Sequence, residues 1–134
     1  MRQGFIGKLA KETGSTLIEF TMVLTILLAL TFAIVDFGRY VYANNIVISA
    51  AQEGARAGIT TSGDPEAAAR DKLITLDPNK ATVSAAYTSD GLGKTYTTVN
   101  VTYEFEFVTP FIGAAAGGPI NIDGSASKLR WSFD

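Results

Sequence analysis

The sequence FTMVLTILLALTFAIV, residues 20–35, is a run of 16 residues without a charge, a proline or a glycine. A helix that crosses a bilayer needs roughly 20 residues, with a range of about 17–25. Including residues 15–18 reaches this length but brings Glu19 into the segment. The remaining chain is too small to enclose a helix that is apolar on every side. No small-x-small cleavage site of a secretory signal peptide follows the run, which continues into VDFGRYVY. The run therefore predicts a retained membrane helix.

The composition excludes several classes of function. The chain has 134 residues, which suits one domain, and it contains neither Cys nor His. Disulfides and thiolate metal sites are therefore impossible, and the commonest general base and zinc ligand are missing. With a formal net charge of −2, there is no basic field to hold nucleic acid. Glu104 and Glu106 share one face of a predicted strand and are read as a solvated pair. We expect no catalytic residue, no metal, no cofactor and no nucleic-acid partner.

The charges that flank the apolar run predict its orientation. Arg2, Lys8 and Lys11 precede the run against a single acidic residue, Glu12. An excess of Lys and Arg marks the cytoplasmic side of a membrane helix. We therefore expect a single-pass protein of the inner (cytoplasmic) membrane, with a cytoplasmic N-terminus and an extracytoplasmic C-terminal domain.

The segment GSTLIE, residues 14–19, followed by the apolar helix, resembles the processing site of type IV pilins and pseudopilins. The resemblance implies that a prepilin peptidase cuts after Gly14, removes the basic leader 1–14 and leaves Ser15 as the new N-terminus. It also implies that Glu19, then the fifth residue, pairs with the Ser15 ammonium of a neighbouring subunit during assembly. Pairing would offset much of the cost of placing each charge in apolar surroundings.

A narrower resemblance is carried by LIEFTMVL, VDFGRYVY and AAQEGARAG in the first half of the chain, and by VNVTYEFEFVTP and GGPINIDGSAS in the second. These segments resemble the TadE-like family, which comprises minor pilins or pseudopilins of tight-adherence (Tad, type IVc) pilus systems. Many relatives have a proline in the apolar helix, where this chain has Leu24 and Thr25. Many pilins begin with Phe or Met, where this chain would begin with Ser15.

The TadE-like resemblance implies a structural subunit that initiates, caps or regulates a pilus. Its partners would be other pilins, major and minor, the prepilin peptidase, the inner-membrane assembly platform and membrane lipid. The alternative is an uncleaved bitopic membrane protein with an extracytoplasmic binding module. Cleavage after Gly14 distinguishes the two.

The helix is expected to continue beyond the membrane and to cover residues 15–58, about 66 Å at 1.5 Å per residue. Asp36 and Arg39, three residues apart, could form a local ion pair, bridge subunits or anchor the helix at the membrane interface. Gly54 and Gly58 form a small-residue step, which would let a sheet or another helix approach closely, and Gly58 could end the helix. These four residues are the candidates for helix interfaces.

Residues 59–134 predict a small α+β domain. Asp64 is the expected N-cap of a short helix over residues 65–75. Strands are expected near residues 82–87, over 99–107 and from 120 to 133, with a bulge at Asp123-Gly124 to reconcile two apolar registers. Residues 109–119 are expected to form a loop, which either folds onto the sheet edge or contacts another subunit or the membrane surface. The predicted fold class is α+β: a long N-terminal membrane-spanning helical spine, packed at its outer half on a small antiparallel sheet of about three strands, plus one short helix.

Overall fold

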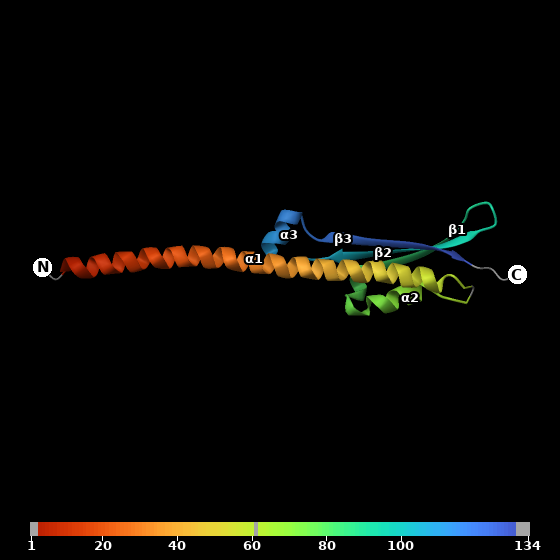
Figure 1. The fold of residues 1–134 in the computed structure, drawn as a ribbon, viewed down its shortest axis with the longest axis horizontal. Helices are drawn as coiled ribbons and strands as arrows, with labels where there is room; N and C mark the ends of the chain where they lie inside the picture. The colour runs from red at the N-terminus through yellow and green to blue at the C-terminus, as the bar shows by residue number, and fades with distance from the viewer. Residues whose placement is uncertain (1–2, 61, 131–134) are drawn as a thin grey trace.

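One long helix, α1 (Gln3–Ala57), forms the axis of the protein in this computed structural model (Figure 1). The structure describes residues 3–60 and 62–130. With 55 residues, α1 is about 82 Å long at 1.5 Å per residue. The predicted helix over residues 15–58 is confirmed, and α1 also extends through most of the expected leader. The sheet and the shorter helices lie along the C-terminal half of α1 (Figure 1), which confirms the predicted α+β class.

Three antiparallel strands form one sheet in the order β1-β2-β3. They are β1 (Ala81–Ser89), β2 (Thr95–Phe105) and β3 (Ile120–Arg130). All three run lengthwise beside α1 (Figure 1). The central strand β2 buries Val99, Val101 and Phe105 on one face and exposes Asn100 and Glu104 on the other. This alternation is the period-2 pattern that the sequence predicts, and it directs one apolar face of the sheet toward α1.

The core lies between this face of the sheet and the small-residue side of α1. Side chains of α1 that contribute to it are Ala43, Val47, Ala50, Ala51 and Ala55, all of them buried. Four of these five residues are alanines, so the helix backbone lies close to the sheet. The facing strands contribute Val99, Val101 and Phe105 from β2 and Ile122 from β3, so the core is thin and holds few large side chains.

A short helix, α2 (Pro65–Lys72), packs against α1 (Figure 1) and also contacts β1 and β2, so that its buried Ala69 belongs to the same core. Its predicted N-cap is confirmed, because Asp64 Oδ1 accepts the N–H groups of Glu66 at 3.0 Å and Ala67 at 3.1 Å. The helix continues as a 3-10 turn, η1 (Leu73–Thr75), so the predicted range 65–75 is helical throughout. A second 3-10 turn, η2 (Pro78–Lys80), leads into β1.

The loop predicted for residues 109–119 is wrong in part, because Pro110–Ala116 form a helix, α3. Pro110 stands at the first helical turn, where its missing N–H is not needed and its fixed φ suits the helix. Three consecutive alanines follow, the strongest helix formers. Gly117 ends the helix with φ of 82°, a left-handed conformation that favours glycine. The Pro and Gly residues that suggested a loop are in fact the two ends of this helix.

The bulge predicted at Asp123-Gly124 is also wrong. β3 pairs with β2 without interruption, from Ile120 opposite Phe105 to Arg130 opposite Thr95. Leu129 simply belongs to the outer face of the sheet, where its partner is Tyr96, so no change of register is needed. Trp131 and Phe133, which suggested the second register, lie outside the described residues.

Candidate functional site

The N-terminal half of α1 carries an apolar surface that the rest of the protein leaves uncovered. From Ser15 to Val35 every residue is exposed except Ala33, which is partly covered. A core helix of a soluble protein would have these side chains buried. Within the described residues, α1 is the one helix that is long and apolar enough to cross a membrane. The protein is therefore compatible with a single-pass membrane topology.

The hydroxyl groups inside the apolar run are satisfied by the helix itself. Thr21 donates to the carbonyl oxygen of Leu17 at 2.8 Å, and Thr25 donates to that of Thr21 at 2.7 Å. Thr31 donates in the same way to Leu27 at 2.8 Å. Each bond spans four residues and needs no water or second chain. These three polar groups are thus compatible with lipid, in which an unsatisfied donor is costly.

Ser15 and Glu19, predicted processing and pairing residues, lie within this uncovered part of α1, and Gly14 directly precedes it. Ser15 and Glu19 are four residues apart and hence lie on one face of the helix. The Glu19 side chain is exposed, and no ion pair joins it to any residue between 14 and 130 that the structure describes. The carboxylate is therefore open to a charge from outside the chain.

Gly14 has no role in the packing of the described chain. A Cβ added there would meet no atom within 4 Å. A glycine inside a helix is about 1 kcal/mol less favourable than alanine, so this glycine is not explained by the fold. The same holds for Gly38, where an added Cβ again meets nothing within 4 Å.

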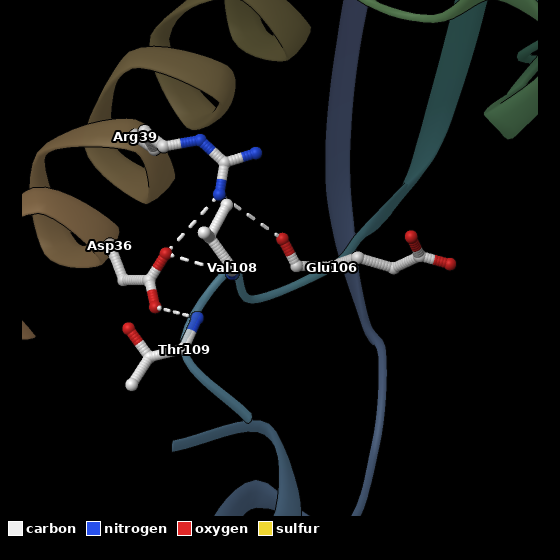
Figure 2. Close-up of polar contacts among 5 residues, drawn as sticks. All are labelled: Asp36, Arg39, Glu106, Val108 and Thr109. Atoms are coloured by element: carbon white, nitrogen blue, oxygen red, sulfur yellow. Dashed lines mark hydrogen bonds and ion pairs between the residues drawn. The ribbon is translucent and has the colours of Figure 1, made fainter. Parts of the chain in front are cut away.

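Asp36 is the junction between the apolar half of α1 and the sheet domain (Figure 2). Its side chain is only 2% exposed. The carboxylate accepts the backbone N–H of Val108 at 3.0 Å on Oδ1 and that of Thr109 at 2.9 Å on Oδ2. Arg39 Nη1 lies 3.2 Å from Oδ1. Three donors therefore surround a charge that burial alone would disfavour.

Arg39 extends the junction toward the end of β2. Besides the Asp36 carboxylate, its Nη1 donates to the carbonyl oxygen of Glu106 at 3.4 Å. The guanidinium carbon lies 5.4 Å from the ring centre of Phe105, a cation–π arrangement. The Glu106 side chain turns away and binds Lys80 Nζ at 2.6 Å. This hydrogen-bonded carboxylate raises the pKa of Lys80 above its usual value.

The sequence brought Asp36 and Arg39 together as a possible local pair, and the structure places them in contact within one chain. The sequence does not predict the larger part of the junction, namely the two N–H groups of Val108 and Thr109. Those groups lie 72 and 73 residues away along the chain. The sequence offers one signal for this junction, namely a charged residue that directly follows an apolar run. This signal does not identify the partner of the charge.

Gly54 and Gly58 lie against neighbouring elements of the same chain. A Cβ on Gly54 would come within 2.7 Å of the carbonyl oxygen of Pro65, in α2. One on Gly58 would overlap the side chain of Thr97, in β2. The hydroxyl of Thr97 also donates to the carbonyl oxygen of Gly58 at 2.8 Å. Both glycines thus permit close packing at the C-terminal end of α1.

The described residues hold no group of three or more Asp and Glu side chains that could bind a metal ion. What the structure presents instead is a helical spine with a bare apolar half and a small α+β domain fixed to its other half. These features define a membrane-compatible α+β protein built on one long helix.

Comparison with known families supports this class. Residues 14–56 match the family model described as TadE-like protein. The matched range begins at Gly14 and ends next to Ala57, the last residue of α1. The predicted resemblance to the TadE-like family is thereby confirmed for these residues of the helix. The resemblance predicted for the C-terminal half stays a prediction. No curated protein and no solved structure matches the chain significantly.

Proposed function

We propose that this protein is a minor pilin or pseudopilin of a Tad pilus, a structural subunit without catalytic activity. The observation that carries the proposal is the coincidence of the TadE-like match, residues 14–56, with a helix whose apolar half is exposed. An exposed apolar half of a helix needs a covering. The membrane would cover it before assembly, and neighbouring pilin helices would cover it afterwards. The sheet domain supports a minor role, since major Tad pilins are expected to be little more than a single helix.

Maturation by a prepilin peptidase after Gly14 is part of the proposal. Gly14 contributes nothing to packing, since an added Cβ would meet no atom within 4 Å. The packing of the chain thus does not require glycine at this position. Recognition by a peptidase would be a reason for a glycine here that lies outside the fold. The cut would release the basic leader 1–14 and leave an ammonium group on Ser15.

Glu19 is proposed to pair with the Ser15 ammonium of the neighbouring subunit. Its carboxylate is exposed and unpaired with any described residue of its own chain. In an assembled bundle both charges would be surrounded by apolar side chains, where each is costly alone and where pairing offsets much of the cost. A subunit that slipped along the bundle would leave both charges unpaired, so the pair would fix the register.

The proposed topology places the N-terminus in the cytoplasm and the sheet domain outside the inner membrane, as the flanking basic residues predict. In this orientation the domain would meet other pilins and the assembly platform at the outer surface. Its role would be to initiate, cap or regulate the pilus.

The test is the N-terminal sequence and intact mass of the protein from cells with and without the prepilin peptidase. The proposal expects a mature chain that starts at Ser15 only when the peptidase is present. A chain that starts at Met1 in both strains would contradict it and favour an uncleaved bitopic membrane protein with an extracytoplasmic binding module. A chain cut elsewhere in both strains would also contradict it.

A further inference from the structure

The segment from Phe107 to Ile120, which contains α3, has no charged residue. It lies at the end of the sheet domain that is nearest the apolar half of α1 (Figure 1). Its two largest outward side chains are Val108 and Phe111, and Phe111 is 79% exposed. We call Val108 and Phe111, together with the exposed Phe37 of α1, the apolar foot; Phe37 lines one hollow with Ile112 of α3. Aromatic and aliphatic side chains gathered at one end of a domain mark a surface that is covered by something.

Asp36 fixes the height of the apolar foot along α1. Its carboxylate binds the N–H groups of Val108 and Thr109 directly before α3 begins. Below α3, an apolar hollow of about 390 Å³ is lined by Ala33 and Phe37 from α1 and by Ile112 from α3. The foot therefore lies level with the last turn of the apolar run.

Burial of Asp36 also lengthens the apolar surface that α1 presents. The charge-free run of residues 20–35 would span only about 24 Å at 1.5 Å per residue. Because Asp36 is 2% exposed, the first exposed charge after Glu19 is that of Arg39. Residues 20–38 then present an uncharged outer surface about 28 Å long, close to the roughly 30 Å of a bilayer's hydrocarbon core. The outer boundary of the hydrocarbon falls at Phe37 and Gly38, beside α3.

From this match of heights we infer that the apolar foot is a membrane-interface anchor, in which Val108, Phe111 and Phe37 enter the outer leaflet that surrounds α1. Lipid is the occupant because the foot continues the surface of α1 that the membrane covers, and because no charge interrupts residues 107–120. Phe and aliphatic side chains are typical of the apolar faces that enter the boundary between headgroups and acyl chains. The anchor would hold the sheet domain against the membrane before assembly. The inference rests on the membrane topology of the proposed function, but not on its role in a pilus.

The chain has no cysteine, so single cysteines can carry an NBD fluorophore in the full-length protein. Three exposed positions form a matched set: Phe111→Cys in the foot, Ile26→Cys in the apolar run and Leu92→Cys in the β1–β2 turn. Their parent side chains are 79%, 67% and 86% exposed, respectively, so no substitution disturbs the core. The β1–β2 turn lies at the end of the sheet farthest from α3 (Figure 1).

The labelled proteins are reconstituted, one protomer per nanodisc, in phosphatidylethanolamine and phosphatidylglycerol with or without phospholipid that carries a nitroxide on its fifth acyl carbon. Quenching at position 111 is expected to be several-fold stronger than at position 92. Equal quenching at 111 and 92, with strong quenching at 26, would overturn the anchor while leaving the topology intact. No quenching at 26 would overturn the topology and the anchor together. A third outcome is that the fluorophore at position 111 is not quenched by lipid in single-protomer discs but becomes shielded from water in discs with several protomers. That result would assign the foot to a neighbouring subunit and overturn the anchor.

Discussion

The carboxylate of Asp36 accepts the backbone N–H of Thr109 across 2.9 Å, although the two residues are 73 positions apart in the chain. This contact joins the end of the apolar run to the segment that begins α3. It explains how a charged residue can directly follow sixteen uncharged ones, because the Asp36 carboxylate is buried and hydrogen-bonded and is not exposed on the helix surface. The hydrogen bonds of Asp36 hold the sheet domain in a fixed position relative to the apolar half of α1 (Figure 2).

Replacing Asp36 by Ala is expected to destabilise the junction by about 1–3 kcal/mol, because it leaves two N–H groups without their acceptor. Hydrogen exchange of the Val108 and Thr109 amides in detergent micelles measures the effect, and both should exchange faster. Arg39→Ala serves as the control. It removes a half-exposed partner worth about 0–1 kcal/mol and leaves both amides bonded. Unchanged protection of both amides in Asp36→Ala would contradict this account of the junction.

Substitution of Gly54 by Ala is expected to lower the free energy of unfolding by about 1–3 kcal/mol, because the added methyl group overpacks the contact with α2. The clash is with the carbonyl oxygen of Pro65 at 2.7 Å, a backbone atom that cannot rotate away. Gly38→Ala is the matched control on the same helix. It meets no atom within 4 Å and should stabilise the helix by up to about 1 kcal/mol. Urea unfolding followed by circular dichroism compares the two variants, and equal effects would be inconsistent with close packing at Gly54.

Thr97→Val is expected to destabilise the domain by about 1 kcal/mol, since it removes the hydroxyl that donates to the carbonyl oxygen of Gly58. This carbonyl lies directly after α1, where carbonyl groups lack partners within the helix. Thr97→Ser keeps the hydroxyl and separates the lost hydrogen bond from the lost methyl contact. If Thr97→Val unfolded at the same temperature as the wild-type protein, the bond would contribute nothing measurable.

Glu19→Ala should leave cleavage after Gly14 intact but strongly reduce pilus assembly, if Glu19 pairs with the ammonium group of Ser15. The N-terminal sequence reports cleavage, and electron microscopy with immunoblots of sheared pili reports assembly. Glu104→Ala, which removes an exposed carboxylate on the outer face of β2, controls for the loss of one negative charge. Normal piliation in Glu19→Ala would rule out the pairing.

The sequence predicted those elements whose pattern is local. The apolar run, the alternation along β2 and the Asp64 cap each depend on residues that are close together within one helix or one strand, and each is found in the structure. Residues that meet across the fold were not predictable in this way. The junction of Asp36 with Val108 is one example, because nothing in the neighbourhood of either residue specifies the other. Gly124 is another: its sequence context predicts a bulge, whereas the residue lies against Val47 of α1, where a Cβ would come within 2.9 Å.

The helix α3 was missed for a different reason. Pro and Gly usually interrupt helices, but their effect depends on their order in the sequence. Pro at the start and Gly at the end of a short alanine-rich segment favour a helix between them. The composition of residues 109–119 was therefore informative, but only when read by position.

The strands run parallel to the long axis of α1 (Figure 1), and this alignment has a mechanical consequence. A force that pulls the apolar half of α1 along its axis reaches the sheet as shear, because it slides the helix lengthwise against β2 and β3. Shear loads many contacts at once, from Ala43 to Ala55, whereas a perpendicular pull would open them one after another. The domain is thus built to resist extraction along the helix better than peeling from it.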